Sequence, residues 1–310
     1  MLEHASKAFF HFLARRTTLR KIAARYGMRG PTGFARRFIA GETVGDAIEA
    51  ARGLEAAGLF HTLDYLGESV TTLAEADAAT LEYRHVVDEV MRSSIERNLS
   101  LKMTQLGLDV DRASAVDNLR KILDRAEGFF VRIDMESSQY TDVTLDIFEM
   151  LWGHGYTQMG VVLQADLYRS EKDLARVMAL GARVRLVKGA YNEPASIAYR
   201  NKSDVDAAYL RLTQTLLAGG NYPAIATHDP IMIERARRFA EERGIAKDRF
   251  EFQMLYGIRR DLQRSLTADG YRVRVYVPFG RQWFAYFMRR LGERPANVGF
   301  VIRGIVLENG

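Results

Sequence analysis

The residues of this sequence that most clearly suggest chemistry are Arg185 and Lys188, in the segment RVRLVKGAYNEP (183–194). Its first part alternates apolar and cationic residues, which is the period of a β-strand with one apolar and one polar face. Short apolar strands separated by helical patterns recur on both sides, so this strand should be central in its sheet. A central strand that places cations inside a fold predicts a bound anionic group.

Polar residues also oppose the apolar positions of the other predicted strands. In a barrel one parity of each strand faces the lumen, which is normally filled by Val, Ile and Leu, and chemistry lies at the carboxyl-terminal mouth. The predicted polar lumen set, late in its strands, is Lys102, Asp134, Gln164, Arg185, Gln253 and Tyr276. The alternative is that these groups only pair with one another; this structural explanation is stronger for Arg132 and Glu251.

A second cationic pair, Arg289 and Arg290, lies late in a predicted aromatic-rich helix at 282–291. Two guanidinium groups held near a polar mouth suit a clamp for a carboxylate or phosphate. The alternative is a solvated helix end that interacts favourably with the helix dipole.

Eight strand-like segments alternate with helical segments after Gly58, which favours a (β/α)₈ barrel. A doubly wound open sheet is the competitor, but the GxGxxG turn typical of that fold is missing. The predicted strands are Leu59–Leu66, Leu99–Leu106, Phe129–Met135, Gln158–Gln164, Ala182–Lys188, Tyr222–Thr227, Phe250–Met254 and Arg272–Val277. The predicted helices between them are Thr71–Asn98, Asp117–Ala126, Thr141–His154, Ser170–Leu180, Asp204–Ala218, Pro230–Arg243 and Gly257–Ala268.

The chain of 310 residues suits one barrel of roughly 250 residues with an extension. We predict an amino-terminal helical arm at 1–57, with helices at Leu19–Tyr26 and Thr43–Ala57, and a barrel at 58–310 whose last helix carries Arg289 and Arg290. An apolar run at Ala8–Ala14 is followed by basic residues. The default interpretation is an amphipathic helix docked on the domain, and attachment to a membrane surface is the alternative.

Composition excludes several classes of protein. Lys and Arg number 44 against 39 Asp and Glu, a modest excess that would attract anionic ligands, and no basic stripe with interleaved aromatic residues predicts nucleic-acid binding. Cysteine is absent, which excludes disulfides and thiolate metal sites and suits a reducing cytoplasm. The six histidines show no metal-binding spacing, so no metal is expected, and no apolar run is long enough for a membrane span.

Nine short motifs, in order along the barrel, resemble the bacterial single-function proline dehydrogenases, which are FAD-dependent. No single motif is specific, but together they are. They are LDYLGE (63–68), LKMTQLG (101–107), RIDME (132–136), VLQA (162–165), RLVKGAYNEP (185–194), ATHD (226–229), FQMLYG (252–257), YVPFG (276–280) and YFMRRL (286–291).

This resemblance implies a distorted (β/α)₈ barrel with FAD bound non-covalently over its mouth, and Asp134 and Arg185 as catalytic residues. It implies FAD contacts from Met135, Gln164, Arg185, Lys188, Gly189, Ala190, Thr227 and His228. It implies a substrate site formed by Lys102, Arg289, Arg290, Tyr276, Tyr191, Leu255 and Glu68, in which Glu68 pairs with Arg289 as a gate.

The implied activity is oxidation of L-proline to Δ1-pyrroline-5-carboxylate, the first step of proline degradation to glutamate. Hydride would pass to FAD and electrons on to a membrane quinone, in a cytoplasmic protein with a peripheral contact to the inner face of the membrane. One alternative is a lyase that uses Lys188 or Lys102 as a Schiff-base amine. The other is a basic, non-enzymatic binding protein.

Overall fold

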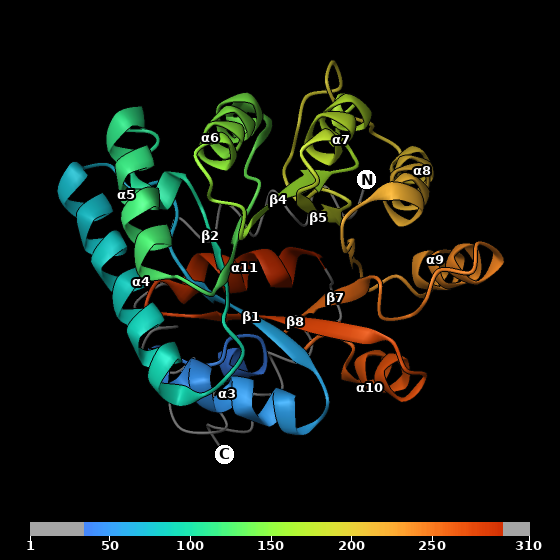
Figure 1. Cartoon of the computed structure of the whole chain (residues 1–310), viewed down its shortest axis with the longest axis horizontal. Helices are drawn as coiled ribbons and strands as arrows, with labels where there is room; N and C mark the ends of the chain where they lie inside the picture. The colour runs from blue at the N-terminus through green and yellow to red at the C-terminus, as the bar shows by residue number, and fades with distance from the viewer. Residues whose placement is uncertain (1–33, 294–310) are drawn as a thin grey trace.

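The computed structural model describes residues 34–293 and forms a closed barrel of eight parallel strands in chain order (Figure 1). All eight predicted strands are present, so the barrel is confirmed over the open sheet. The strands are β1 (Phe60–Tyr65), β2 (Asn98–Leu101), β3 (Phe130–Ile133), β4 (Met159–Gln164), β5 (Arg183–Val187), β6 (Ala224–Ala226), β7 (Glu251–Leu255) and β8 (Arg272–Phe279).

Helices surround the strands as an outer ring, while α11 lies within that ring in the view of Figure 1. The α-helices are α3 (Val44–Ala56), α4 (Leu73–Ser93), α5 (Arg112–Arg125), α6 (Thr141–Gly153), α7 (Ser170–Ala179), α8 (Lys202–Gly219), α9 (Pro230–Glu242), α10 (Arg260–Ala268) and α11 (Trp283–Glu293). Three short 3₁₀ helices are η1 (Phe34–Arg37), η2 (Thr104–Leu106) and η3 (Ser138–Tyr140). Between residues 34 and 293, no helix combines the length and apolar character of a membrane span.

Side-chain caps define where several helices begin. Thr72 and Asp111 accept hydrogen bonds from backbone N–H groups in the first turns of α4 and α5. Asp229 does the same for α9, which has Pro230 at its first position. Each such cap contributes about 1 kcal/mol and fixes the point at which the chain turns from the barrel mouth into a helix.

Apolar residues of alternating strand positions build the main core. Leu63, Val131 and Val275 are buried in one cluster with helix residues such as Tyr83 and Leu119. A smaller cluster joins Phe38 and Ile39 to the buried aromatic residues of α11, and so fixes that helix beside the mouth. Because side chains alternate along each strand, the apolar residues face the surrounding helices and the residues between them face the lumen of the barrel.

The predicted arm is only partly described. Its last helix is confirmed as α3, which begins after a capping box formed by Thr43 and Asp46 and packs in the same core as β1 and β8. The predicted helices Ala8–Ala14 and Leu19–Tyr26 lie outside the described residues, as does the chain beyond residue 293. The boundary between residues 57 and 58 stays a prediction.

Some predicted boundaries were wrong. The strand at Leu99–Leu106 ends at Leu101, and η2 follows, because the backbone N–H of Thr104 binds Glu136 instead of a neighbouring strand. The helix predicted to reach Asn98 ends at Ser93, followed by Ser94 in the left-handed region, and Asn98 begins β2. Capping by Asp111 starts α5 five residues before the predicted start at Asp117.

Candidate active site

A cavity of about 470 Å³ lies at the carboxyl-terminal mouth of the barrel, between the strand ends and α11. All six residues of the predicted polar lumen set line it, and α11 adds Tyr286 and Arg290. The parity argument is therefore confirmed for these six side chains. Arg132 and Glu251, for which the structural explanation is stronger than for the other polar residues, do not line this cavity.

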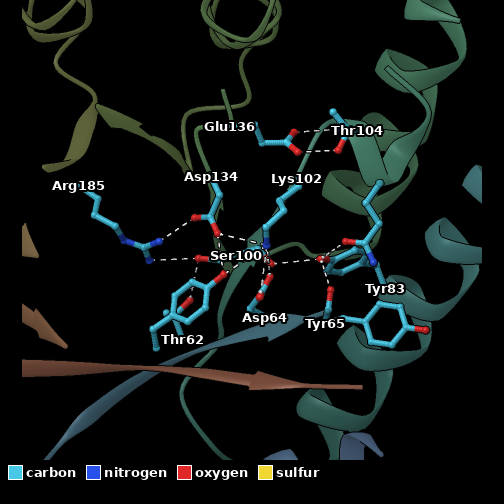
Figure 2. Close-up of polar contacts among 12 residues, drawn as sticks. Thr62, Asp64, Tyr65, Tyr83, Ser100, Lys102, Thr104, Asp134, Glu136 and Arg185 are labelled. Carbon is cyan, nitrogen blue, oxygen red and sulfur yellow. Dashed lines mark hydrogen bonds and ion pairs between the residues drawn. The ribbon is translucent and has the colours of Figure 1, made fainter. Parts of the chain in front are cut away.

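Arg185 occupies the centre of the site and is 5% exposed. Its guanidinium group donates to Asp134 Oδ1 at 2.7 Å and to Ser100 Oγ at 3.1 Å (Figure 2). A third hydrogen bond goes to Gln253 Oε1 at 2.5 Å. It also lies over the ring of Tyr276, 5.3 Å from the centroid. Contacts from four strands or strand ends fix this cation in one orientation, so it presents a preorganised positive charge to the cavity.

Lys102 is the second buried cation of the mouth. Its Nζ lies 3.1 and 3.3 Å from the two carboxylate oxygens of Asp64 and 3.7 Å from Asp134 Oδ2 (Figure 2). Burial opposes the charged form of Lys102, but the carboxylates of Asp64 and Asp134 outweigh burial and raise its pKa. The side chain therefore stays an ammonium group at physiological pH.

Tyr276 contacts both the acidic and the cationic residues of the mouth. Its hydroxyl group donates to Asp134 Oδ2 at 2.7 Å and lies 3.5 Å from Lys102 Nζ. Burial, followed by the charges of Asp134 and Asp64, raises the pKa of Tyr276 far above its usual value. The phenol therefore remains a hydrogen-bond donor, and two cations and two carboxylates compensate each other inside the mouth.

Arg290 adds a further cation to the cavity wall, with its guanidinium group 5.1 Å from the centroid of the Tyr286 ring. Tyr191 and Leu255, which the resemblance assigns to the substrate pocket, line the same cavity. The side chain of Arg289 lies outside the described residues, so the predicted pairing with Glu68 stays a prediction. Glu68 is half-buried and lies outside the cavity lining.

The residues that the resemblance assigned to FAD also border this cavity. The set comprises Met135, Gln164, Arg185, Lys188, Gly189, Ala190, Thr227 and His228. Gln164 is fixed by a hydrogen bond to the Glu136 carbonyl at 3.0 Å, and His228 Nε2 accepts from the Leu255 N–H at 2.9 Å. These contacts with the protein itself fix the polar groups of Gln164 and His228, so this part of the cavity wall is preorganised.

Lys188 and Gly189 directly follow strand β5, and each has a specific local requirement. Lys188 Nζ lies between Asp206 Oδ1 at 2.5 Å and Asp229 Oδ2 at 2.9 Å. Gly189 has a φ of +121°, and a Cβ atom there would lie 2.0 Å from an Asp166 carboxylate oxygen. Only glycine fits this turn, which lets the backbone pass closely beside the wall of the cavity.

Sequence reasoning missed several polar residues of the site. Asp64 is fully buried, and burial raises its pKa even beside Lys102. It lies on β1, where the parity rule that found the other lumen residues would have found it as well. Asp206 contributes from a helix, and nothing in its local pattern predicts a contact with Lys188.

Glu136 was also missed, and it lies just behind the mouth. Its carboxyl group accepts from the Thr104 N–H at 3.1 Å and the Thr104 hydroxyl at 2.5 Å (Figure 2). Burial raises its pKa to about 7, because these bonds and the charge of Lys102 offset only part of the desolvation. Within residues 34–293, no cluster of three or more His, Asp or Glu side chains is placed to hold a metal ion.

Comparison with known proteins gives a consistent result. The family described as proline dehydrogenase matches residues 47–303. The chain is 41% identical to proline dehydrogenase 1 of Bacillus subtilis (strain 168) over 308 residues, covering 99% of each protein. It is 44% identical to the proline dehydrogenase of Deinococcus radiodurans over 278 residues, covering 88% of this chain and 90% of that one.

A solved structure shares the fold. Proline utilization A (PutA) from Bdellovibrio bacteriovorus, inactivated by N-propargylglycine, matches with a TM-score of 0.78 and 28% sequence identity. The match covers 84% of this chain and 32% of that chain, so the present chain corresponds to about a third of the longer protein.

Proposed function

The chain belongs to the proline dehydrogenase family, and from this premise we propose that it oxidises L-proline to Δ1-pyrroline-5-carboxylate with FAD as its cofactor and a membrane quinone as electron acceptor. The observation that carries the proposal is the mouth of the barrel, where Lys102 and Arg290 face the same cavity as Arg185 and Tyr276. This arrangement offers cations to a small carboxylate beside a wall suited to a cofactor.

The carboxylate of proline would bind to Lys102 and Arg290, with Arg289 as the further predicted partner. Lys102 remains charged because Asp64 and Asp134 raise its pKa. Since Asp64 holds Lys102 in place from the side away from solvent, the ammonium group needs little reorganisation when a second anion arrives. Such preorganisation reduces the cost of binding and fixes which part of the substrate faces the reacting centre.

The proline ring would lie against Tyr276, Leu255 and Tyr191. The hydroxyl group of Tyr276 is engaged with Asp134, so the phenol is fixed and limits the space for ring substituents. These residues would hold the C5–N bond in one orientation and exclude water from it. No protein base is needed if the amine is already neutral, and Asp134, which is bonded to Arg185 and Tyr276, is better suited to positioning.

The chemistry of the wall fits FAD. Amide, guanidinium, ammonium and imidazole groups from Gln164, Arg185, Lys188 and His228 match a planar ring system with polar edges and a phosphate chain. Gly189 belongs to the same wall, and its turn has no room for a Cβ atom beside the Asp166 carboxylate. When bound, FAD would supply the acceptor for the two electrons removed from proline. Arg185 would stabilise the negative charge that develops beside it.

The Schiff-base alternative is less well supported. A nucleophilic amine requires a lowered pKa, whereas the pKa of Lys102 is raised by two carboxylates. Lys188 lies between two carboxylates as an ion pair. Lys102 is therefore not arranged as a neutral amine, and Lys188 is engaged by two carboxylates, so we favour the redox reaction.

An anaerobic absorbance spectrum before and after addition of L-proline tests the proposal. We expect flavin bands in the purified protein and their bleaching by L-proline, with D-proline as the matched control. A folded, colourless protein would overturn the FAD assignment, and covalent trapping of a carbonyl compound by borohydride would favour the lyase. A menaquinone or ubiquinone analogue should then restore the flavin bands, and failure of both would remove the quinone from the proposal.

A further inference from the structure

The loops around the mouth are connected in series by side-chain contacts. The Ser69 N–H donates to Thr104 Oγ1 at 2.9 Å, and the hydroxyl of Thr104 donates in turn to Glu136. On the same loop as Glu136, Ser138 contacts Glu193. The series thus links the loops that follow β1, β2, β3 and β5, and the last three of these loops carry residues that line the cavity.

The last contact of the series joins two loops that are not neighbours in the sheet. The backbone N–H of Ser138 donates to Glu193 Oε1 at 2.8 Å, and its hydroxyl donates to Glu193 Oε2 at 2.5 Å. Ser138 begins η3, which runs directly into α6, and neither helix has a side-chain cap from its own sequence. Glu193 therefore supplies a capping carboxylate from another loop, where an N-terminal helix end favours negative charge.

Glu193 is also close in sequence to the residues that line the cavity. Gly189, Ala190 and Tyr191 line it, and Glu193 follows two residues after Tyr191 but does not line it. Backbone hydrogen bonds fix the chain on both sides of this segment. On one side the Asp166 N–H donates to the Lys188 carbonyl, and on the other the Ile197 N–H donates to the Pro194 carbonyl. Between these two points, the carboxylate of Glu193 adds two hydrogen bonds to Ser138.

We propose that Glu193 is a positioning residue for the substrate pocket: by capping η3 it holds Tyr191 against the substrate and the segment 189–193 closed over the mouth. The inference rests on the proposed function, because it assigns Tyr191 to the proline pocket. Glu193 itself contacts neither substrate nor cofactor and acts through the loop that it fixes.

Loss of this contact should weaken substrate binding more than it slows the reaction. For Glu193→Ala we expect the KM for L-proline to rise by about five- to tenfold, with kcat changed by less than about twofold, since a displaced Tyr191 removes uniform binding. Glu193→Gln keeps an acceptor oxygen without the charge and should restore most of the affinity. Ser138→Ala keeps the backbone donor and should raise KM by only about two- to threefold.

Hydrogen exchange of the backbone amides in 189–193 provides a readout that does not depend on proline. We expect faster exchange in Glu193→Ala than in the wild-type holoenzyme and an intermediate rate in Ser138→Ala. Glu171→Ala is the matched control, because Glu171 lies in the first turn of α7 and pairs with Arg211. It should alter neither KM nor exchange in this segment.

The outcomes separate this inference from the proposed function. If Glu193→Ala lowers the melting temperature but leaves both KM and exchange of 189–193 unchanged, Glu193 is only a helix cap and the inference fails. If the wild-type protein does not oxidise proline, the proposed function fails, while the exchange measurement still decides whether Glu193 fixes the loop. If Glu193→Ala does not fold, the same comparison is made with Ser138→Ala and Glu193→Gln.

Discussion

The barrel contains two layers of charged side chains, one at the cavity and one whose groups pair only within the protein. The mouth layer comprises Asp64, Lys102, Asp134 and Arg185, and all of these except Asp64 line the cavity. The floor layer comprises the buried residues Arg132, Glu251 and Arg274, with the partly exposed Glu96 at its edge. Arg132, Glu251 and Arg274 lie two residues before Asp134, Gln253 and Tyr276 in the sequence. The same strand period therefore produces both layers, and their partners decide what each can do.

The floor layer is closed by its own contacts. Arg274 donates to Glu251 at 2.8 Å, to Glu96 at 2.8 Å and to the His61 carbonyl at 2.5 Å. Arg132 donates to the carbonyl groups of Val161 and Arg183. These bonds satisfy the buried groups within the protein and make the floor a structural element.

Aromatic rings complete the floor. Phe60 lies near the guanidinium groups of Arg272 and Arg274, and Phe130 lies near those of Arg132 and Arg183, at 4.9–6.0 Å from the ring centroids. Tyr222 lies between Arg183 and Arg272. The faces of these rings attract positive charge, so they help to accommodate several cations at the floor.

Two buried glutamates illustrate the difference between the two ends. For Glu251 on the floor, burial raises the pKa, but the charge and hydrogen bond of Arg274 outweigh burial and lower it overall. For Glu136 at the mouth, burial prevails and the pKa reaches about 7. The comparison teaches that a fully paired carboxylate stabilises the fold, whereas a carboxylate without a close cation remains able to exchange a proton near neutral pH.

The largest effect should come from the floor. Arg274→Met leaves Glu251 buried without its nearest cation, which typically costs about 3–5 kcal/mol of unfolding free energy. Urea unfolding followed by circular dichroism measures this loss. Arg211→Met, which removes an exposed pair with Glu171, is the control and should cost less than about 1 kcal/mol. An equal loss of unfolding free energy in the two variants would contradict the structural role of the floor layer.

The next effect should be on substrate binding at the mouth. Lys102→Met removes a cation expected to bind the proline carboxylate, so kcat/KM should fall by at least about 30-fold, the equivalent of about 2 kcal/mol. Stability should fall less than in Arg274→Met, because Asp64, whose pKa is already raised by burial, can take up a proton. Steady-state kinetics and urea unfolding of both variants check the contrast, and retained kcat/KM in Lys102→Met would contradict the proposed carboxylate site.

A smaller effect should appear in the pH dependence of stability. Glu136 binds its proton more tightly in the folded state, so its contribution makes stability fall as pH rises from about 4.5 towards about 7. Glu136→Gln should remove this slope, on the order of 3 kcal/mol across that range. Glu251, whose pKa is lowered, should show the opposite slope, with its stabilisation lost as pH falls. Unfolding curves at a series of pH values measure both, and an unchanged slope in Glu136→Gln would exclude this carboxyl group as the source.

The smallest effect should come from Tyr276→Phe. The change removes one hydroxyl hydrogen bond to Asp134, worth about 1 kcal/mol. We expect flavin content to be retained and the discrimination between L-proline and hydroxylated proline to decrease, measured as a ratio of kcat/KM values. Loss of flavin in this variant would show that Tyr276 belongs to the cofactor wall and not to the substrate pocket.

The sequence itself determined the barrel and its polar lumen. A period of two in each strand, helical patterns between strands and caps at Thr43, Thr72 and Asp229 are local properties, so eight strands and six cavity residues could be predicted. The end of β2 could not, because Thr104 leaves the strand to bind Glu136, which lies 32 residues away.

Only the tertiary structure decided which charges became partners. Asp64 meets Lys102 across 38 residues, Asp206 reaches Lys188 from a helix, and Glu193 caps Ser138 across 55 residues. The strand pattern says that a side chain faces the lumen, but not which opposite charge faces it from another strand or loop. Those distances exist only after the barrel closes, and because electrostatic energy depends on distance and burial, the chemistry of the mouth is fixed by the closed fold.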